Sequence, residues 1–286
     1  MWECNLGSPV ASRWVAGQYQ WELTSKALLM GIVNVTPDSF SDGGRFGSLE
    51  QTVAGALTME GEGADILDIG GESTRPGAKP VSLEEELSRV IPVVSKLAER
   101  SKAAISIDTC KPEVARQAVE AGASIVNDVT GLTDSRMLEF CAESDCGVVV
   151  MHMKGTPETM QSQANYDDVV REMQEFFQER HETLVCAGIA QERIVFDPGI
   201  GFGKTFEHNM ALIERMGELI VEGRPVLIGL SRKSFIGTLL GTNVLSDREA
   251  PTIALTALSR SRGAMVHRVH SVQENLHALR MIEAII

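Results

Sequence analysis

The sequence is poor in cysteine and lacks cysteine pairs. Its 286 residues contain five cysteines, with no C-x-x-C pair among them: Cys4, Cys110, Cys141, Cys146 and Cys186. An odd number at irregular spacing excludes a disulfide framework and a zinc site of the usual spacing. Reduced thiols are typical of the cytoplasm, so we expect a cytoplasmic protein.

Positive charge is also scarce. The chain has 26 Lys and Arg against 39 Asp and Glu, which gives a formal net charge of −13. A field of that sign disfavours nucleic acid and anionic membranes as partners. An anionic substrate would therefore need lysine, arginine or a metal ion gathered at its binding site.

Long apolar runs are absent as well. No run approaches the roughly 20 residues that a transmembrane helix needs, and the start Met-Trp-Glu-Cys lacks the basic and apolar parts of a signal peptide. We therefore expect no membrane partner. Hydrophobic residues make up 43% of the chain, which is enough to bury a large core without disulfides or structural metals.

What the sequence does contain is a recurring unit: a short apolar run, a polar or glycine-rich turn, and a segment with helical periodicity. The apolar runs predict strands at 28–33, 66–69, 104–107, 124–126, 147–150, 194–196, 226–230 and 264–269. The periodic segments predict helices at 49–62, 83–100, 112–121, 134–142, 167–187, 206–217, 234–241 with 250–261, and 272–286.

Eight strand–helix units in a chain of this length predict a single (β/α)₈ TIM-barrel domain over residues 1–286. An open doubly wound sheet is the alternative. Residues 1–27 precede the first unit, and there Tyr19, Trp21 and Leu23 alternate with polar neighbours. We expect them to form a short hairpin that covers the bottom of the barrel.

A TIM barrel builds its site at the carboxyl ends of the strands, and polar residues follow each predicted strand. They are Asn34; Asp68 with Thr74 and Arg75; Asp108; Asn127 and Asp128; His152; Asp197; Ser231, Arg232 and Lys233; and Arg268 and His270. A barrel that served only as a scaffold would not need a polar side chain on every strand. The pattern therefore indicates a ligand site.

The chemistry of this ring narrows the ligand. Carboxylates and an amide suit a neutral heterocycle with adjacent donors and acceptors; these residues are Asp108, Asn127 and Asp197, with Lys233 beside them. Phosphate or carboxylate would be held by Arg75, Arg268 and His270. The neutral oxygen of Asn34 suits Mg²⁺, which relies largely on water and substrate phosphates.

Glycine-rich loops fit the same interpretation. Residues 70–78 (GGESTRPGA) and 197–204 (DPGIGFGK) allow close approach of backbone to a flat ligand. Neither matches a P-loop or a dinucleotide fingerprint. Residues 36–46 (TPDSFSDGGRF) have the composition of a mobile lid.

Each polar residue also has a purely structural interpretation. Asp68, Asn127 and Asp128 could satisfy turn backbone, and Asp108 could cap a helix. His152, between two methionines, is more simply a packed core residue, and "SRKS" (residues 231–234) could be a solvated turn. All of these interpretations would have to coincide at one end of the barrel.

The motifs taken together resemble those of bacterial dihydropteroate synthases from about residue 28 onward. In order they are MGIVNVTPDSFSDGG (30–44), DIGGESTRPGA (68–78), SIDTCKPEV (106–114), NDVTGL (127–132), MHMKGTPETMQ (151–161), DPGIGFGKT (197–205), GLSRKSFIGTLLG (229–241) and RVH (268–270). The resemblance implies a cytoplasmic transferase of folate biosynthesis, a target of sulfonamides. It would join 6-hydroxymethyl-7,8-dihydropterin diphosphate to 4-aminobenzoate, giving 7,8-dihydropteroate and diphosphate.

The resemblance also implies roles for single residues. The pterin would be held by Asp108, Asn127, Asp197, Lys233 and Arg268, with Met151, Phe202 and Gly229 lining its slot. The diphosphate would meet Asn34, Arg75, Arg268 and His270, with Asn34 as the Mg²⁺ ligand. The aminobenzoate would meet Phe40, Thr74, Arg75, Pro76 and Ser234. The residues expected to act in catalysis are Asn34, Asp68, Arg75, Lys233, Arg268 and His270.

One position departs from the family pattern. Where the family usually has Asp after RVH, this chain has Ser271. A carboxylate near Arg268 would then be missing, so we expect Arg268 to be less firmly oriented.

Other classes remain open at this point. A pterin-binding methyltransferase barrel, a non-catalytic paralogue and a purely structural barrel are the alternatives. The family is usually dimeric, and the apolar segments 252–259 and 272–286 could pair with a second copy.

Overall fold

The structure, a computed structural model, describes residues 13–35, 49–74, 78, 80–156 and 158–286. Its main sheet has eight parallel strands in the order β8-β7-β6-β5-β4-β3-β10-β9. These strands are β3 (Leu28–Asn34), β4 (Ile66–Gly70), β5 (Ala104–Asp108), β6 (Ile125–Asp128), β7 (Gly147–Met151), β8 (Ile194–Asp197), β9 (Leu227–Ile228) and β10 (Val266–Val269).

The two edges of this sheet meet. Val226, just before β9, forms a parallel bridge with Phe196 of β8, and the Phe196 N–H donates to the Pro225 carbonyl at 3.1 Å. The sheet therefore closes into a barrel. The predicted (β/α)₈ fold is confirmed, and the open sheet is excluded.

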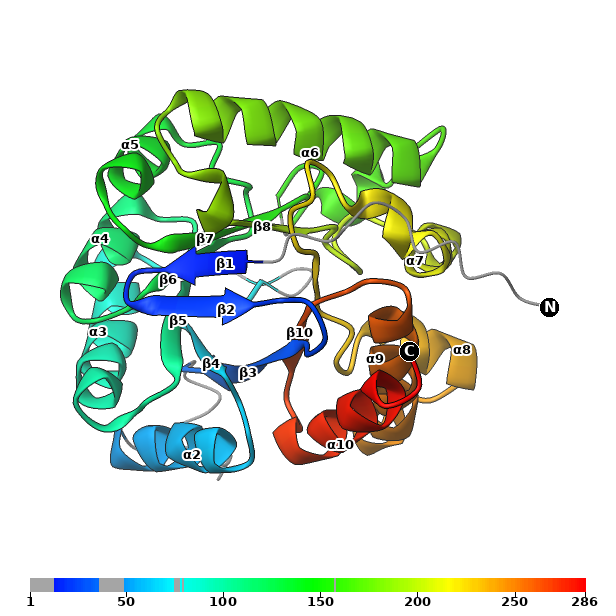
Figure 1. Cartoon of the computed structure of the whole chain (residues 1–286), viewed down its shortest axis with the longest axis horizontal. Coiled ribbons are helices and arrows are strands. Elements are labelled where there is room, and N and C mark those ends of the chain that lie inside the picture. The colour runs from blue at the N-terminus through cyan, green and yellow to red at the C-terminus, as the bar shows by residue number, and fades with distance from the viewer. Residues whose placement is uncertain (1–12, 36–48, 75–77, 79, 157) are drawn as a thin grey trace.

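Helices surround the strands on the outside (Figure 1). They are α2 (Leu49–Gly61), α3 (Leu83–Arg100), α4 (Pro112–Glu120), α5 (Ser135–Glu143), α6 (Val169–Cys186), α7 (Phe206–Glu214), α8 (Ser234–Leu240), α9 (Glu249–Ser261) and α10 (Val272–Glu283). No helix among the described residues is both long and apolar enough to cross a bilayer.

Side chains set where several helices begin and end. Asp134, Asp168 and Thr205 each accept a hydrogen bond from backbone N–H groups in the first turn that follows. Gly122 and Gly188 follow α4 and α6 with φ of 116° and 100°, a backbone conformation that glycine adopts without strain. The helix ends predicted at residues 121 and 187 are confirmed to within one residue.

The apolar side chains form two cores. One lies between the outer face of the barrel and the helices. The other fills the barrel interior with one or two residues from each strand. These residues include Leu28, Met30, Ile66, Ala104, Ile125, Val149, Val195, Leu227 and Val266. Because successive side chains of a strand point to opposite faces, the residue two positions beyond each interior apolar residue also points inward. That alternation decides which polar residues face the barrel mouth.

A hairpin closes the bottom of the interior core. It consists of β1 (Arg13–Ala16) and β2 (Tyr19–Glu22), and Figure 1 shows it in blue across the strands. The buried Trp14 packs among the interior core residues, and its Nε1 donates to the Arg193 carbonyl at 3.2 Å. The predicted hairpin is therefore confirmed.

Trp14→Ala should destabilise the fold strongly, because it opens a cavity at the sealed end of the barrel. We expect a loss of about 3–5 kcal/mol in the free energy of unfolding, measured by urea denaturation. Trp21→Ala is the matched control, since Trp21 lies on the same hairpin but is only partly buried. Equal losses for the two variants would contradict the assignment of Trp14 to the barrel core.

Candidate active site at the barrel mouth

Strand alternation brings five predicted site residues to the inside of the barrel mouth. Asp68 lies two residues after Ile66, and Asp108 lies four after Ala104; Asn127, Asp197 and Arg268 each lie two after an interior apolar residue. Neighbouring strands pair so that Asp108 is opposite Asn127. The barrel interior thus has an apolar layer toward its bottom and a polar layer above that one, at the mouth.

An arginine between two carboxylates holds this polar layer together. Arg268 Nε donates to Asp68 Oδ2 at 2.6 Å, and its Nη2 donates to Asp108 Oδ2 at 2.7 Å. Asn127 Nδ2 donates to Asp68 Oδ2 at 3.2 Å. Asp68 is fully buried, and Asp108 and Asn127 are nearly so. We predicted that Ser271, in place of the family's Asp, would leave Arg268 less firmly oriented. That prediction is wrong, because Asp68 and Asp108 hold Arg268.

Two buried carboxylate oxygens in this layer have no hydrogen-bond partner among the described residues. They are Asp68 Oδ1 and Asp108 Oδ1. A buried acceptor without a partner costs free energy unless a ligand supplies a donor. The two oxygens therefore indicate where a ligand with N–H groups would bind.

Burial dominates the electrostatics of the site. It raises the pKa of Asp108 to about 7 although Arg268 opposes the shift. It also raises the pKa of Asp197, against a hydrogen bond from the Gly199 N–H. Burial lowers the pKa of Lys233 to about 8, with Asp197 opposing. Asp108 and Lys233 can therefore change protonation near neutral pH when a charged ligand binds.

A second wall of the site comes from the loop after β8. The ammonium of Lys233 lies 4.1 Å from the centroid of the Phe202 ring, a cation–π contact. At Gly201, with φ of 81°, a Cβ would lie 3.3 Å from Lys233 Cδ. Glycine there lets the loop approach the lysine closely. The predicted slot residues Phe202 and Lys233 are thus in direct contact.

Lys204, which was not among the predicted site residues, anchors this loop. Its Nζ lies 3.2 Å from His152 Nδ1 and 3.1 Å from the Phe202 carbonyl. Lys204 is buried, and that burial lowers its pKa to about 7. His152 itself stacks edge-on against Phe176, so its interpretation as a packed core residue is confirmed. The sequence feature that could have identified Lys204 is its position at the end of the glycine-rich segment 197–204.

The other predicted site residues that the structure describes lie at the carboxyl ends of their strands or follow them. Asn34 ends β3, His270 follows β10, and its Nδ1 lies 2.9 Å from Ser231 Oγ. Met151 is buried at the end of β7, while Thr74 and Gly229 are partly buried and Ser234 is exposed. Phe40, Arg75 and Pro76 lie outside the described residues.

Asp128 does not belong to the site. Its carboxylate accepts hydrogen bonds from the backbone N–H groups of Thr130 and Leu132 at 2.8 and 3.0 Å. It points away from Asn127 because adjacent residues of a strand face opposite sides. The structural interpretation of Asp128 as a turn residue is confirmed.

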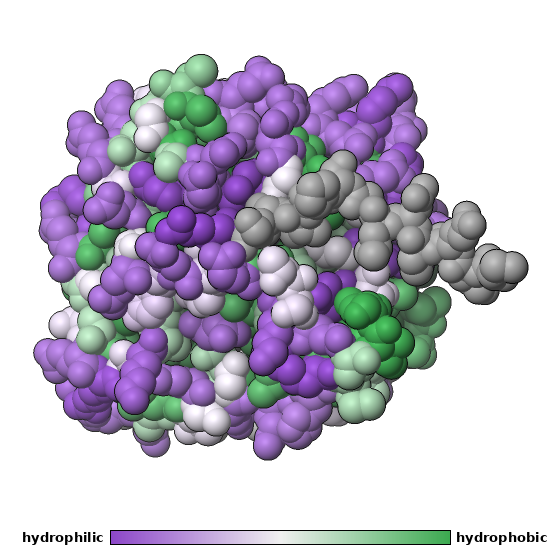
Figure 2. Space-filling view, in the orientation of Figure 1, coloured by the Kyte–Doolittle hydropathy of each residue, from purple (hydrophilic) through white to green (hydrophobic). Residues whose placement is uncertain are grey.

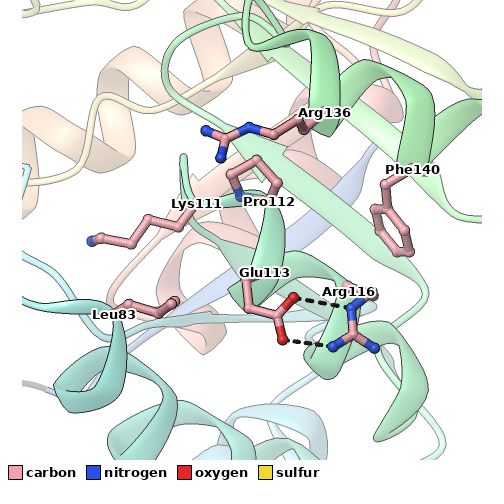
Figure 3. A pocket seen from close by; sticks show the side chains of 7 residues that line it. All are labelled: Leu83, Lys111, Pro112, Glu113, Arg116, Arg136 and Phe140. Carbon is pink, nitrogen blue, oxygen red and sulfur yellow. Dashed lines mark hydrogen bonds and ion pairs between the residues drawn. The ribbon is translucent and has the colours of Figure 1, made fainter.

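The described residues also enclose a cavity of about 420 Å³ between α3, α4 and α5 (Figure 3). It is lined by Leu83, Lys111, Pro112, Glu113, Arg116, Arg136 and Phe140. Each of its three cations is already paired with carboxylates of this chain. Because these cations are paired, the cavity offers little positive charge to an anionic ligand, and no predicted site residue lines it.

The expected Mg²⁺ would need oxygen donors from side chains at the mouth. No group of three or more His, Cys, Asp and Glu side chains among the described residues could hold a metal ion. Asn34, at the end of β3, would supply one neutral oxygen. That donor set fits an ion that keeps several waters and takes its other ligands from substrate phosphates.

The fold and this charged mouth together define a class of protein, the pterin binding enzymes. The profile of that family matches residues 30–270, and the chain belongs to the family.

Within the family, the chain is similar to particular enzymes. It is 48% identical to the dihydropteroate synthase of Escherichia coli (strain K12) over 256 residues, which cover 90% of each chain. The dihydropteroate synthase of Yersinia pestis in a sulfonamide drug complex superposes with a TM-score of 0.90 at 42% identity, covering 95% of this chain and 98% of that one. The Xanthomonas albilineans enzyme with 4-aminobenzoic acid gives a TM-score of 0.89 at 45% identity, covering 96% and 98%.

Removing the arginine should make the stability of the fold depend on pH. In Arg268→Met, Asp68 and Asp108 lose their buried partner, so the folded-state pKa of Asp108 should rise further above its unfolded value. A carboxyl with a raised folded pKa favours the fold at low pH and loses that contribution as pH rises through the folded pKa. We expect a loss of about 3–5 kcal/mol at pH 8 and a smaller loss at pH 5, measured by urea denaturation.

Arg116→Met is the control for this prediction, because Arg116 pairs with Glu113 and Glu120 on the exposed face of α4. It should cost less than about 1 kcal/mol at either pH. A pH-independent loss in Arg268→Met would contradict the buried-carboxylate explanation.

Proposed function

We propose that this chain joins 6-hydroxymethyl-7,8-dihydropterin diphosphate to 4-aminobenzoate, giving 7,8-dihydropteroate and diphosphate. The observation that carries the proposal is the mouth of the barrel, where buried carboxylates with unpaired oxygens lie beside Arg268 and Lys233. The chain's likeness to dihydropteroate synthases over nine-tenths of its length supports the same reaction. The pterin-binding methyltransferase is disfavoured, because relatives of 48% and 43% identity are dihydropteroate synthases.

The pterin would bind deep in the mouth. Its amino-pyrimidinone edge presents adjacent N–H donors, which suit the unpaired Asp108 Oδ1 and the carboxylate of Asp197. Asn127 can donate and accept at once. Phe202 offers an aromatic face on the same side as Lys233. Met151 and Gly229 complete the slot.

The diphosphate would meet the cations at the rim. Arg268 lies in β10 and His270 directly follows that strand, and Arg75 is expected to join them from the loop after β4. Asn34 would hold Mg²⁺ through its side-chain oxygen. When bound, that ion would neutralise charge on the diphosphate.

The chemistry these residues can promote is charge separation. The bond between the pterin methylene carbon and the diphosphate oxygen breaks, and its electron pair leaves with the diphosphate. The ring delocalises the positive charge that develops on carbon, and Asp108 and Asp197 stabilise it. Preorganised groups of this kind contribute roughly 3–4 kcal/mol each to the transition state. The aniline nitrogen then forms the new bond to carbon and loses a proton, with no dedicated general base.

The aminobenzoate would bind second and nearer the surface. Thr74, in the loop after β4, is partly buried, and Ser234, the first residue of α8, is exposed. Phe40, Arg75 and Pro76 are predicted to complete this side. Sulfonamides resemble aminobenzoate and should compete for the same outer pocket.

The proposed reaction is tested by pyrophosphate release from the pterin diphosphate with Mg²⁺, with and without 4-aminobenzoate. Release should depend on the amine and yield dihydropteroate. Asp108→Ala should lower pterin affinity by about 100-fold, the size of two lost charge-assisted hydrogen bonds. Binding without release in the native chain would instead indicate a non-catalytic paralogue. Normal turnover by Asp108→Ala would refute the pterin site.

The chain also has the features of a homodimer built from its C-terminal helices. Exposed apolar side chains lie on α8, α9 and α10 and at the residues after α10: Leu239, Leu240, Leu258, Met281, Ile285 and Ile286. Figure 2 shows apolar residues (green) on this side of the molecule, beside the C-terminal end. Exposed apolar groups of this extent are typical of protein interfaces.

A cytoplasmic location remains the expectation, and the free thiols at Cys110, Cys141, Cys146 and Cys186 are consistent with it.

Met281→Glu should weaken this dimer, because Met281 is 67% exposed on α10 and would be covered by the second copy. Introducing a charge into an apolar contact should raise the dissociation constant by about 100-fold or more. Sedimentation velocity over a concentration series measures it. Glu274→Gln, on the first turn of α10, is the control and should leave the dimer intact. A monomeric native chain would refute the proposal.

A further inference from the structure

The turn after β9 holds an unusual backbone conformation. Arg232 lies there between Ser231 and Lys233, with φ of 57°. A residue with a Cβ pays roughly 1–2 kcal/mol to adopt this left-handed conformation. The surroundings must therefore hold Arg232 in place, and Lys233 depends on them because it is the next residue.

The start of α9 holds the backbone of Arg232 on both sides. The Arg232 N–H donates to Thr252 Oγ1 at 3.2 Å, and its carbonyl accepts from Arg248 Nη1 at 3.1 Å. Thr252 Oγ1 in turn donates to the Arg248 carbonyl at 2.7 Å. The turn is thus braced from a neighbouring helix rather than from its own strand.

A carboxylate on the same helix holds the side chain of Arg232. Arg232 Nε forms an ion pair with Glu249 Oε1. Ser271 bridges the two groups: its Oγ donates to Glu249 Oε2 at 2.9 Å and accepts from Arg232 Nη2 at 3.3 Å. The side chains of Arg232 and Glu249 are only 31% and 24% exposed, so water screens the pair less than it screens a surface salt bridge.

This cluster also ties the β9 turn to the end of β10. Ser231 Oγ accepts from the His270 N–H at 3.2 Å and lies 2.9 Å from His270 Nδ1. Two consecutive residues of the turn are therefore bonded to two consecutive residues after β10. Lys233 and His270, which are proposed to meet the pterin and the diphosphate, are set by the same cross-links.

We propose that Glu249 is a positioning residue of the active site. Its carboxylate holds Arg232 in the left-handed conformation and so places Lys233 and His270 for the pterin diphosphate. The same geometry accounts for Ser271. A carboxylate at position 271 would lie beside Arg232, and in this chain Glu249 of α9 supplies a carboxylate there instead. The inference rests on the proposed function and deepens it.

The test is a double-variant comparison. Glu249→Gln removes the charge and keeps the size, and it should lower kcat/KM for the pterin diphosphate by about tenfold, the size of one charge-assisted hydrogen bond. Adding Ser271→Asp to it should restore kcat/KM to within about threefold of the native value, because the new carboxylate can pair with Arg232. Asp247→Asn is the matched control: Asp247 lies two residues before Glu249 and bonds only the exposed Thr242 hydroxyl among the hydrogen bonds described.

The outcomes separate the two ideas. Amine-dependent release by the native chain tests the proposed function, whereas calorimetric binding of the pterin diphosphate without amine compares the variants independently of turnover. Unchanged binding and kcat/KM in Glu249→Gln would overturn the positioning role, as would a double variant no better than Glu249→Gln. A lowered melting temperature with native kinetics would show a merely structural role and also overturn it.

A milder variant covers the case in which Glu249→Gln does not fold. Ser271→Ala removes one hydrogen bond from each of Arg232 and Glu249 while the ion pair remains. It should lower kcat/KM for the pterin diphosphate by about threefold. Native kcat/KM in this variant would overturn the proposal.

Discussion

The structure of the site depends on one buried ion triad, in which Arg268 lies between Asp68 and Asp108. The arginine comes from β10 and the two carboxylates from β4 and β5, with β3 between them in the sheet. A single guanidinium thus links strands that do not pair directly. Two carboxylates against one cation leave an excess of negative charge, and that excess suits a ligand that becomes positive during reaction.

The triad is possible because the barrel separates its tasks along the strand axis. Below the polar layer, the interior side chains are apolar and the Trp14 hairpin seals them from water. The polar layer itself is formed by the inward-facing side chains of Asp68, Asp108, Asn127, Asp197 and Arg268. Burial of the apolar lower half stabilises the fold. This stabilisation offsets the free-energy cost of the upper half, which buries charged groups whose pKa values are displaced. Changes at the two ends of the barrel should therefore have different consequences.

The loops around the mouth are held mostly by their neighbours in space. Lys204 ties the β8 loop to the end of β7, and Ser231 ties the β9 turn to His270. Glu249 reaches the same turn from α9. The first two links join segments that follow different strands, and the third joins two segments that both follow β9. The mouth is consequently a ring of cross-linked turns, and this explains how short polar loops can present side chains to a substrate in fixed positions.

The sequence by itself determined the eight strand–helix units, the hairpin and most of the polar ring, since hydrophobic periodicity and strand alternation are local properties that short segments reveal. It also indicated the family through long motifs such as DPGIGFGKT. Only the tertiary structure decided which partner each charge takes. Arg268 bonds with Asp68, 200 residues away, and not with position 271; Lys204 and Glu249 gained roles from neighbours that no spacing predicts. Partner choice is a long-range property, because closing the barrel brings together strand ends that are distant in the chain.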